Sequence, residues 1–109
     1  MRIEVLFFDG CPNRGPAVER VQEVLREEGI SADVVEVNVT EPSIARELRF
    51  LGSPTVRVNG LDAELDARAA SGYGIMCRTY ATNGRREGMP TREMLREAIR
   101  EASTEANEK

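Results

Sequence analysis

The chain has two cysteines, and the first follows directly on an apolar run. In residues 4–15, EVLFFDGCPNRG, the run ends at Asp9-Gly10 and Cys11 comes next. The thiolate is the reactive form of cysteine, and the unpaired amides and the dipole at a helix N-terminus favour it. Arg14 adds a cation nearby, and Pro12 suits a first helical position because it has no N–H to leave unsatisfied. Cys11 is therefore a candidate nucleophile.

The second cysteine, Cys77, lies beside Met76 in an apolar stretch. It is either a plain core residue or a partner for Cys11. Paired, the two would make a two-cysteine redox protein; as joint ligands, two thiolates would bind a soft metal such as Hg(II) or Cu(I). A buried structural thiol is the alternative for Cys11 as well. Arg78 is either a solvated charge or a contact for a thiolate or ligand.

The amino-acid composition excludes some catalytic groups and argues against some kinds of partner. The 109 residues contain no His, which excludes a His base, a Cys–His dyad and His metal ligands. The net charge of −4 is spread over mixed charges, so nucleic-acid binding is not indicated. No window approaches the roughly 18 apolar residues of a membrane span, and the first residues do not resemble a signal peptide. We expect a cytoplasmic protein with reduced thiols and no cofactor.

Alternating strands and helices must position these residues. The spacing of apolar residues predicts, in order, a strand at 2–8, a helix at 14–28, a strand at 31–39, a short helix from Pro42, a strand at 55–58 that returns through an Asn59-Gly60 turn, and a last helix opened by Pro90-Thr91. The first two strands should be parallel, as in a βαβ unit. Residues 64–89 form an insertion without a clear prediction, apart from an extra strand over IMCRTYA and an Asn83-Gly84 turn. The tail STEANEK is expected to fray.

The order of these elements resembles the thioredoxin and glutaredoxin superfamily. Cys11-Pro12-Asn13-Arg14 stands where that superfamily has its Cys-x-x-Cys or Cys-x-x-Ser motif. Ser53-Pro54-Thr55 matches the cis-proline before the third strand, and 56–60 looks like the glutaredoxin-type hairpin. More narrowly, FDGCPN, GSPT and GxxCRxY are similar to small bacterial thioredoxin-like proteins, some named for thioredoxin and some for organomercurial lyase.

The resemblance implies a single thioredoxin-like α/β domain over residues 1–109, with a mixed sheet of about four strands and helices on both faces. It also implies that Ser53 and Pro54 line the site beside Cys11 and offer backbone groups to a bound thiol substrate. Position 14 departs from the motif, because Arg14 stands where a second cysteine would resolve the reaction. Cys11 then acts alone, through a glutathione-type mixed disulfide, or finds Cys77. We expect the Cys77 segment to lie over the site.

These observations together predict thiol–disulfide exchange, in which Cys11 attacks and Cys77 is the candidate resolving cysteine. The substrates would be protein or low-molecular-weight disulfides, with glutathione among them, and neither nucleic acid nor membrane is expected as a partner. The residues expected to contact substrate are Pro12, Arg14, Ser53, Pro54 and Arg78. Two alternatives stay open: a binding module that captures a soft metal or an organomercurial through both cysteines, and a thioredoxin-type scaffold without chemistry.

Overall fold

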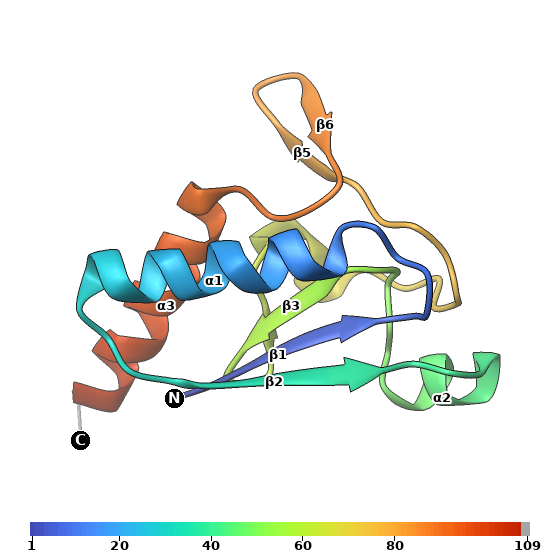
Figure 1. Ribbon diagram of the computed structural model, residues 1–109, viewed down its shortest axis with the longest axis horizontal. Helices are drawn as coiled ribbons and strands as arrows, with labels where there is room; N and C mark the ends of the chain where they lie inside the picture. Colours follow the sequence, from blue (N-terminus) through green and yellow to red (C-terminus); the bar gives the residue numbers. More distant parts are fainter. Residues whose placement is uncertain (108–109) are drawn as a thin grey trace.

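A four-stranded sheet in the order β2-β1-β3-β4 forms the centre of the computed structural model, which describes residues 1–107 (Figure 1). Its strands are β1 (Arg2–Phe7), β2 (Asp33–Asn38), β3 (Thr55–Val58) and β4 (Leu61–Asp62). As predicted, β1 pairs in parallel with β2, while β3 is antiparallel to β1. The interior place of β1 explains its apolar residues on both faces, since Val5 and Leu6 belong to opposite cores.

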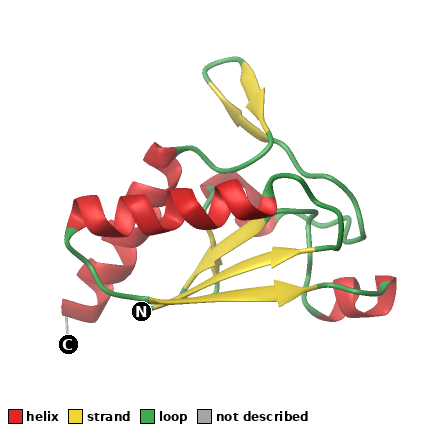
Figure 2. Ribbon diagram, in the orientation of Figure 1, coloured by secondary structure: helices red, strands yellow, loops and turns green. Residues whose placement is uncertain are grey.

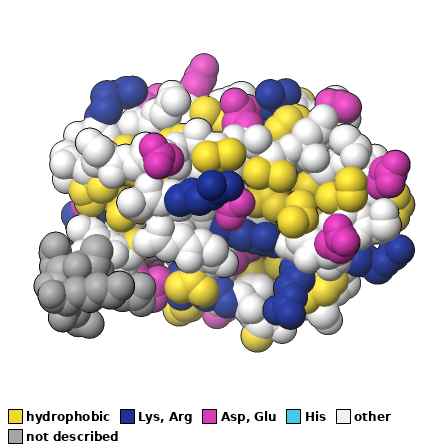
Figure 3. Space-filling model, turned by 90° about the horizontal axis from the view of Figure 1, so that it is seen from below, with side chains coloured by type: hydrophobic (Ala, Val, Ile, Leu, Met, Phe, Trp, Pro, Cys, Tyr) yellow, Lys and Arg dark blue, Asp and Glu magenta, His cyan; other side chains and the backbone are white. Residues whose placement is uncertain are grey.

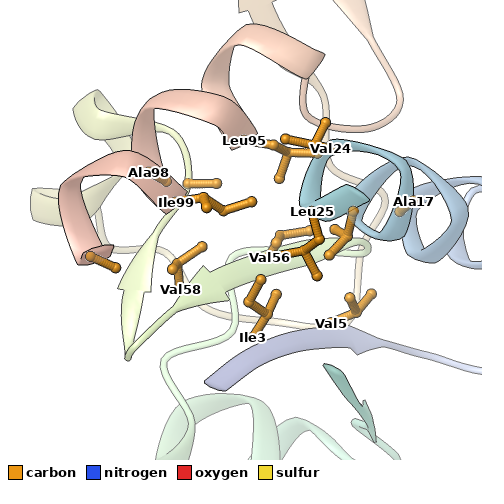
Figure 4. Close-up of a cluster of buried hydrophobic side chains, with 13 residues drawn as sticks. Ile3, Val5, Ala17, Val24, Leu25, Val56, Val58, Leu95, Ala98 and Ile99 are labelled. Carbon is orange, nitrogen blue, oxygen red and sulfur yellow. The ribbon is translucent and has the colours of Figure 1, made fainter. Parts of the chain in front are cut away.

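Helices cover both faces of this sheet (Figure 2). On one face, α1 (Arg14–Glu28) and α3 (Arg92–Asn107) enclose the larger core, in which Val5, Val56 and Ile99 lie (Figure 4). On the other face, α2 (Pro42–Glu47) contributes to a smaller core with Leu6 and Phe50. The predicted α/β class, a mixed four-stranded sheet with helices on both faces, is confirmed and is consistent with a thioredoxin-like fold.

The helix boundaries match the predictions from the sequence at some ends and differ from them at others. α1 ends at the left-handed Gly29, whose N–H donates to Arg26 O, as a C-terminal glycine should. The prediction that Pro12 opens this helix is wrong, because Pro12 precedes the N-cap residue Asn13 and Pro16 lies in the first turn instead. α3 continues through Asn107, so the structure has helix at 103–107, and the expected fraying of this tail stays a prediction; residues 108–109 lie outside the described part.

Residues 64–89 contain three short elements that the sequence resolved only in part. A 3₁₀ helix, η1 (Leu65–Ala69), is followed by the hairpin of β5 (Tyr80–Thr82) and β6 (Arg85–Glu87), which projects from the body of the molecule (Figure 1). The expected Asn83-Gly84 turn is present, with φ of 47° and 77°. Positive φ at both central residues suits a tight hairpin, and Asn and Gly tolerate it best.

Candidate functional site

Three predicted site segments meet at one end of the sheet. β1 and β3 are antiparallel, with Leu6 opposite Thr55, so the loop after β1 and the loop before β3 lie at the same end (Figure 2). The first loop carries Cys11 and the second carries Ser53 and Pro54. A parallel β-bridge joins Ser53 to Cys77 and adds the third segment. The Cys77 segment therefore lies beside the cis-proline loop, and its expected position over Cys11 stays a prediction.

A tight turn holds Cys11 close to the end of β1. The Cys11 N–H donates to Phe8 O at 3.2 Å, and Gly10 has a φ of 89°. A side chain at position 10 would strain this turn, which explains the glycine. Cys11 is a free thiol of intermediate exposure, which removes the alternative of a fully buried structural cysteine. α1 begins three residues later, at Arg14.

Arg14 contacts its neighbours on the sheet. Its Nε donates to Glu36 Oε1 at 2.8 Å, and its guanidinium lies over the Phe7 ring, 3.9 Å from the centroid. Glu36 therefore offsets the positive charge of Arg14, which the sequence analysis expected to stabilise the Cys11 thiolate. Arg14 and Pro12 are both exposed, and their contact with a substrate stays a prediction.

The backbone of the cis-proline loop is paired within the chain. The Ser53–Pro54 peptide bond is cis, as the resemblance implies. The Ser53 N–H donates to Met76 O at 2.8 Å, and Ser53 O accepts from the Arg78 N–H at 3.0 Å. Pro54 O accepts from the buried Tyr80 hydroxyl at 2.5 Å. The resemblance implies that this loop offers backbone groups to a substrate; here those groups have partners in the protein.

The two cysteines differ in exposure. Cys77 is exposed, so the alternative of a core residue is wrong. Its neighbours Ile75 and Met76 are also among the exposed large apolar side chains, at 38% and 41%. Alternation along the bridge turns Arg78 inward, where it is 7% exposed. The structure therefore presents Cys77 to solvent and buries the residue after it.

Arg78 belongs to a buried polar cluster, and its description as a solvated charge is wrong. Its guanidinium donates to both oxygens of Asp62, at 2.7 and 2.9 Å, and to Thr55 Oγ1 at 3.1 Å. Glu64 lies at its edge, 3.3 Å away, and the Tyr80 ring stacks against it, 4.2 Å from the centroid. A bidentate Arg–carboxylate pair with further acceptors around the guanidinium has the geometry that tolerates burial.

Burial shifts two pKa values in this cluster. Desolvation by burial raises the pKa of the Tyr80 hydroxyl well above its usual range, and the neighbouring Arg78 charge opposes that shift only in part. For Arg78, burial alone would lower the pKa, but the hydrogen bonds to Asp62 and the nearby acidic groups together outweigh it, and the pKa is raised. The cluster therefore holds a permanent cation beside a neutral tyrosine.

Three residues of this cluster were not predicted from the sequence as part of the site: Asp62, Thr55 and Tyr80. Asp62 lies in the short returning strand between Leu61 and Ala63, where a lone charge in an apolar run was the only signal. The Ser53 hydroxyl was also missed as a special group. It is buried, and among the side chains that the structure describes it is a polar group without a hydrogen-bond partner.

The rest of the described surface adds little to the site. A cavity of about 270 Å³ lies between the loop after α2, the β3–β4 hairpin and the η1 region, and neither cysteine lines it. On the face seen in Figure 3, cationic and anionic side chains are interspersed with apolar ones. Within residues 1–107, no helix combines the length and apolarity needed to cross a membrane. No group of three or more Cys, Asp or Glu in that range is arranged to hold a metal.

Fold and site together define an α/β protein in which a cysteine turn and a cis-proline loop share one end of the sheet. Residues 15–99 match the sequence model of a family described as a domain of unknown function, DUF2703, and the chain belongs to this family. The matched range includes Pro54 and Cys77, and begins after Cys11. Comparison with curated proteins and with solved structures found no match.

Proposed function

We propose that the protein carries out thiol–disulfide exchange, with Cys11 as nucleophile and Cys77 as candidate resolving cysteine. One observation carries this proposal: the Cys11 turn, cis-Pro54 and the exposed Cys77 segment meet at the same end of the sheet. Both thiols are free, and neither is fully buried. Exchange requires an accessible thiolate, and a second thiol nearby determines how the first product resolves.

The reaction has two balanced steps. The Cys11 thiolate attacks one sulfur of a disulfide, R–S–S–R, so that a Cys11–S–S–R bond forms and RS⁻ leaves. The Cys77 thiolate then attacks Cys11 Sγ, which forms the Cys11–Cys77 disulfide and releases the second RS⁻. Two protein thiols are oxidised and one disulfide is reduced to two thiols. An excess of low-molecular-weight thiol reverses both steps and restores the reduced protein.

The substrate-binding residues of the proposal are Pro12, Arg14, Ser53 and Pro54. Pro12 and Arg14 are exposed and close to Cys11 in the chain, whereas Ser53 and Pro54 are buried in the loop at the same end of the sheet. The Arg78 side chain faces Asp62 inside the protein. Its role in the proposal is to hold the cis-proline loop, through the bond from its backbone N–H to Ser53 O. The proposal includes protein and low-molecular-weight disulfides as substrates, glutathione among them, in a reducing compartment such as the bacterial cytoplasm.

Peptide mapping tests this function directly. Reduced protein is incubated with glutathione disulfide, alkylated, and mapped by mass without reduction. We expect a Cys11–Cys77 crosslink in the wild type and a glutathione adduct on Cys11 in Cys77→Ser, because the resolving thiol is then missing.

The same map separates the remaining outcomes. An adduct on Cys11 alone in the wild type would keep single-thiol chemistry and remove the resolving role of Cys77. If the Cys11→Ser variant reduced disulfides as fast as the wild type, the proposal would be lost.

A second function is favoured by the same two free thiols. Two thiolates without a third ligand suit soft ions that accept low coordination, such as Hg(II) or Cu(I). A soft-metal or organomercurial binding protein would therefore use Cys11 and Cys77 together. Tight Hg(II) binding that either Cys→Ser change abolishes, in a protein without disulfide reduction, would favour this function. Unreactive cysteines in both assays would indicate a scaffold used only for protein contacts.

A further inference from the structure

The segment Gly74–Arg78, here called the cover segment, lies along the cis-proline loop like an added strand. Gly74 N–H donates to Phe50 O at 3.1 Å, and the Met76 and Arg78 backbones make the two bonds to Ser53. An edge with open N–H and C=O groups is where an extended peptide adds as a new strand. At Ser53 the protein's own chain already occupies that position.

Packing between the two segments leaves no room for a second strand. A Cβ at Gly52 would lie 3.0 Å from Arg78 Cβ and 3.1 Å from Met76 O, so the backbones approach as closely as a glycine allows. The loop carbonyls are also occupied, because Gly52 O accepts from Thr55 Oγ1 at 2.6 Å and Pro54 O accepts from Tyr80. The single N–H that Ser53 can donate is used.

Buried groups hold the cover segment in place. Immediately after Cys77, Arg78 binds Asp62 and Thr55 inside the protein. Two residues further on, Tyr80 is fully buried and bonds the cis-proline carbonyl. To move the cover segment, the protein would have to expose a charged pair from its interior. The cover segment is thus a fixed part of the site.

We propose that the cover segment is the specificity determinant of this site: it excludes extended polypeptides and leaves Cys11 to small disulfides, of the size of cystine or glutathione disulfide. This inference rests on the proposed function and narrows its substrates from protein and low-molecular-weight disulfides to the small ones. A small disulfide needs only access to Cys11 Sγ, whereas a peptide that pairs with the loop must displace the backbone bonds of Ser53.

Two substrates with identical leaving groups test the inference. One is the mixed disulfide of thionitrobenzoate with N-acetylcysteinamide; the other carries the same group on the central cysteine of an unstructured ten-residue peptide. Attack by Cys11 forms Cys11–S–S–R and releases the coloured thionitrobenzoate in both cases. Rates are divided by those of dithiothreitol, which corrects for intrinsic reactivity.

We expect the small substrate to react about tenfold faster than the peptide, the order of effect of displacing two backbone hydrogen bonds. Asp62→Asn removes half of the Arg78 anchor and should raise the peptide rate relative to the small one. Asp66→Asn is the matched control, since Asp66 is exposed in η1. If Asp62→Asn fails to fold, Tyr80→Phe loosens the cover segment by removing the bond to Pro54 O.

The possible outcomes test the specificity role separately from thiol–disulfide exchange itself. Equal normalised rates that both depend on Cys11 would overturn the specificity role and leave thiol exchange standing. Release no faster than from Cys11→Ser, for both substrates, would overturn both. Amide exchange gives a second measurement: the Ser53 and Arg78 N–H groups should exchange slowly, and fast exchange would show that the cover segment is not fixed.

Discussion

At the residue scale, the polar groups of Ser53 differ in their hydrogen bonding. Its backbone N–H and C=O are both paired with the cover segment, while its hydroxyl is buried without a partner. A buried polar group without a hydrogen bond usually costs free energy and calls for an explanation. Ser53 precedes cis-Pro54 and pairs with Cys77, so a contact with a reacting sulfur atom during exchange would explain the buried hydroxyl.

Ser53→Ala should therefore leave the free energy of unfolding unchanged within about 1 kcal/mol, or increase it slightly, because no hydrogen bond is lost. Urea unfolding of the two reduced proteins measures this. A much larger loss of stability would show that the hydroxyl has a partner in solution. A lower exchange rate at unchanged stability would assign the hydroxyl to the reaction.

At the scale of elements, buried polar contacts attach the segment between β4 and β5 to the sheet. β4 supplies Asp62, β3 supplies Thr55, and both bind Arg78 just after the bridge. β5 begins with Tyr80, which bonds the loop before β3. An isolated two-stranded hairpin is only marginally stable in water, so the β5–β6 pair depends on this anchor at its base.

The Tyr80 anchor should make stability depend on alkaline pH. The folded state raises the pKa of this hydroxyl above its ordinary value of about 10, so folding favours the neutral form. The stability contribution is fully present below about pH 10 and is lost as the pH rises through the folded-state pKa. We expect the stability advantage of the wild type over Tyr80→Phe to stay constant from pH 8 to about pH 10 and to shrink from pH 10 to pH 11 in urea unfolding. An advantage constant across that range would contradict a buried neutral tyrosine.

At the scale of the whole molecule, the larger core joins α1 and α3 to the sheet (Figure 4). Ion pairs also connect the two helices, among them Glu28 with Arg100 at 2.6 Å, and the hydrogen bond from Arg100 lowers the pKa of Glu28. Glu28 is half-buried but Arg100 is exposed, so water and salt screen part of the attraction. Apolar burial therefore determines whether the helices stay on the sheet.

Ile99→Ala should reduce the free energy of unfolding by about 2–5 kcal/mol, because Ile99 is fully buried and a cavity would remain. Ile75→Ala is the matched control: Ile75 is 38% exposed, so its loss should cost much less. Chemical unfolding with two probes, helix signal and tyrosine fluorescence, measures both variants. Equal losses at the two positions would contradict the burial on which the prediction depends.

Sequence by itself determined the elements that repeat a simple pattern. The bounds of α1 and β3, the parallel β1–β2 pair and the two Asn-Gly turns follow from local periodicity or from residues with particular backbone angles, and the cis-proline from the family resemblance. These features are local, or are fixed by the handedness of a βαβ unit. The position of Cys11 after a strand belongs to the same group.

Only the tertiary structure decided which side chains of residues 64–89 are buried and which are exposed. In the sequence, Cys77 looked apolar enough for the core and Arg78 charged enough for the surface, and the structure reverses both. The physical reason is pairing between distant segments. A backbone bridge to Ser53 and a carboxylate from Asp62 turn Arg78 inward, and the alternation of side chains then turns Cys77 outward. Ser53 lies 24 residues from Cys77 in the chain, and Asp62 lies 16 residues from Arg78. Contacts at such separations leave no local sequence pattern that predicts which side chain is buried.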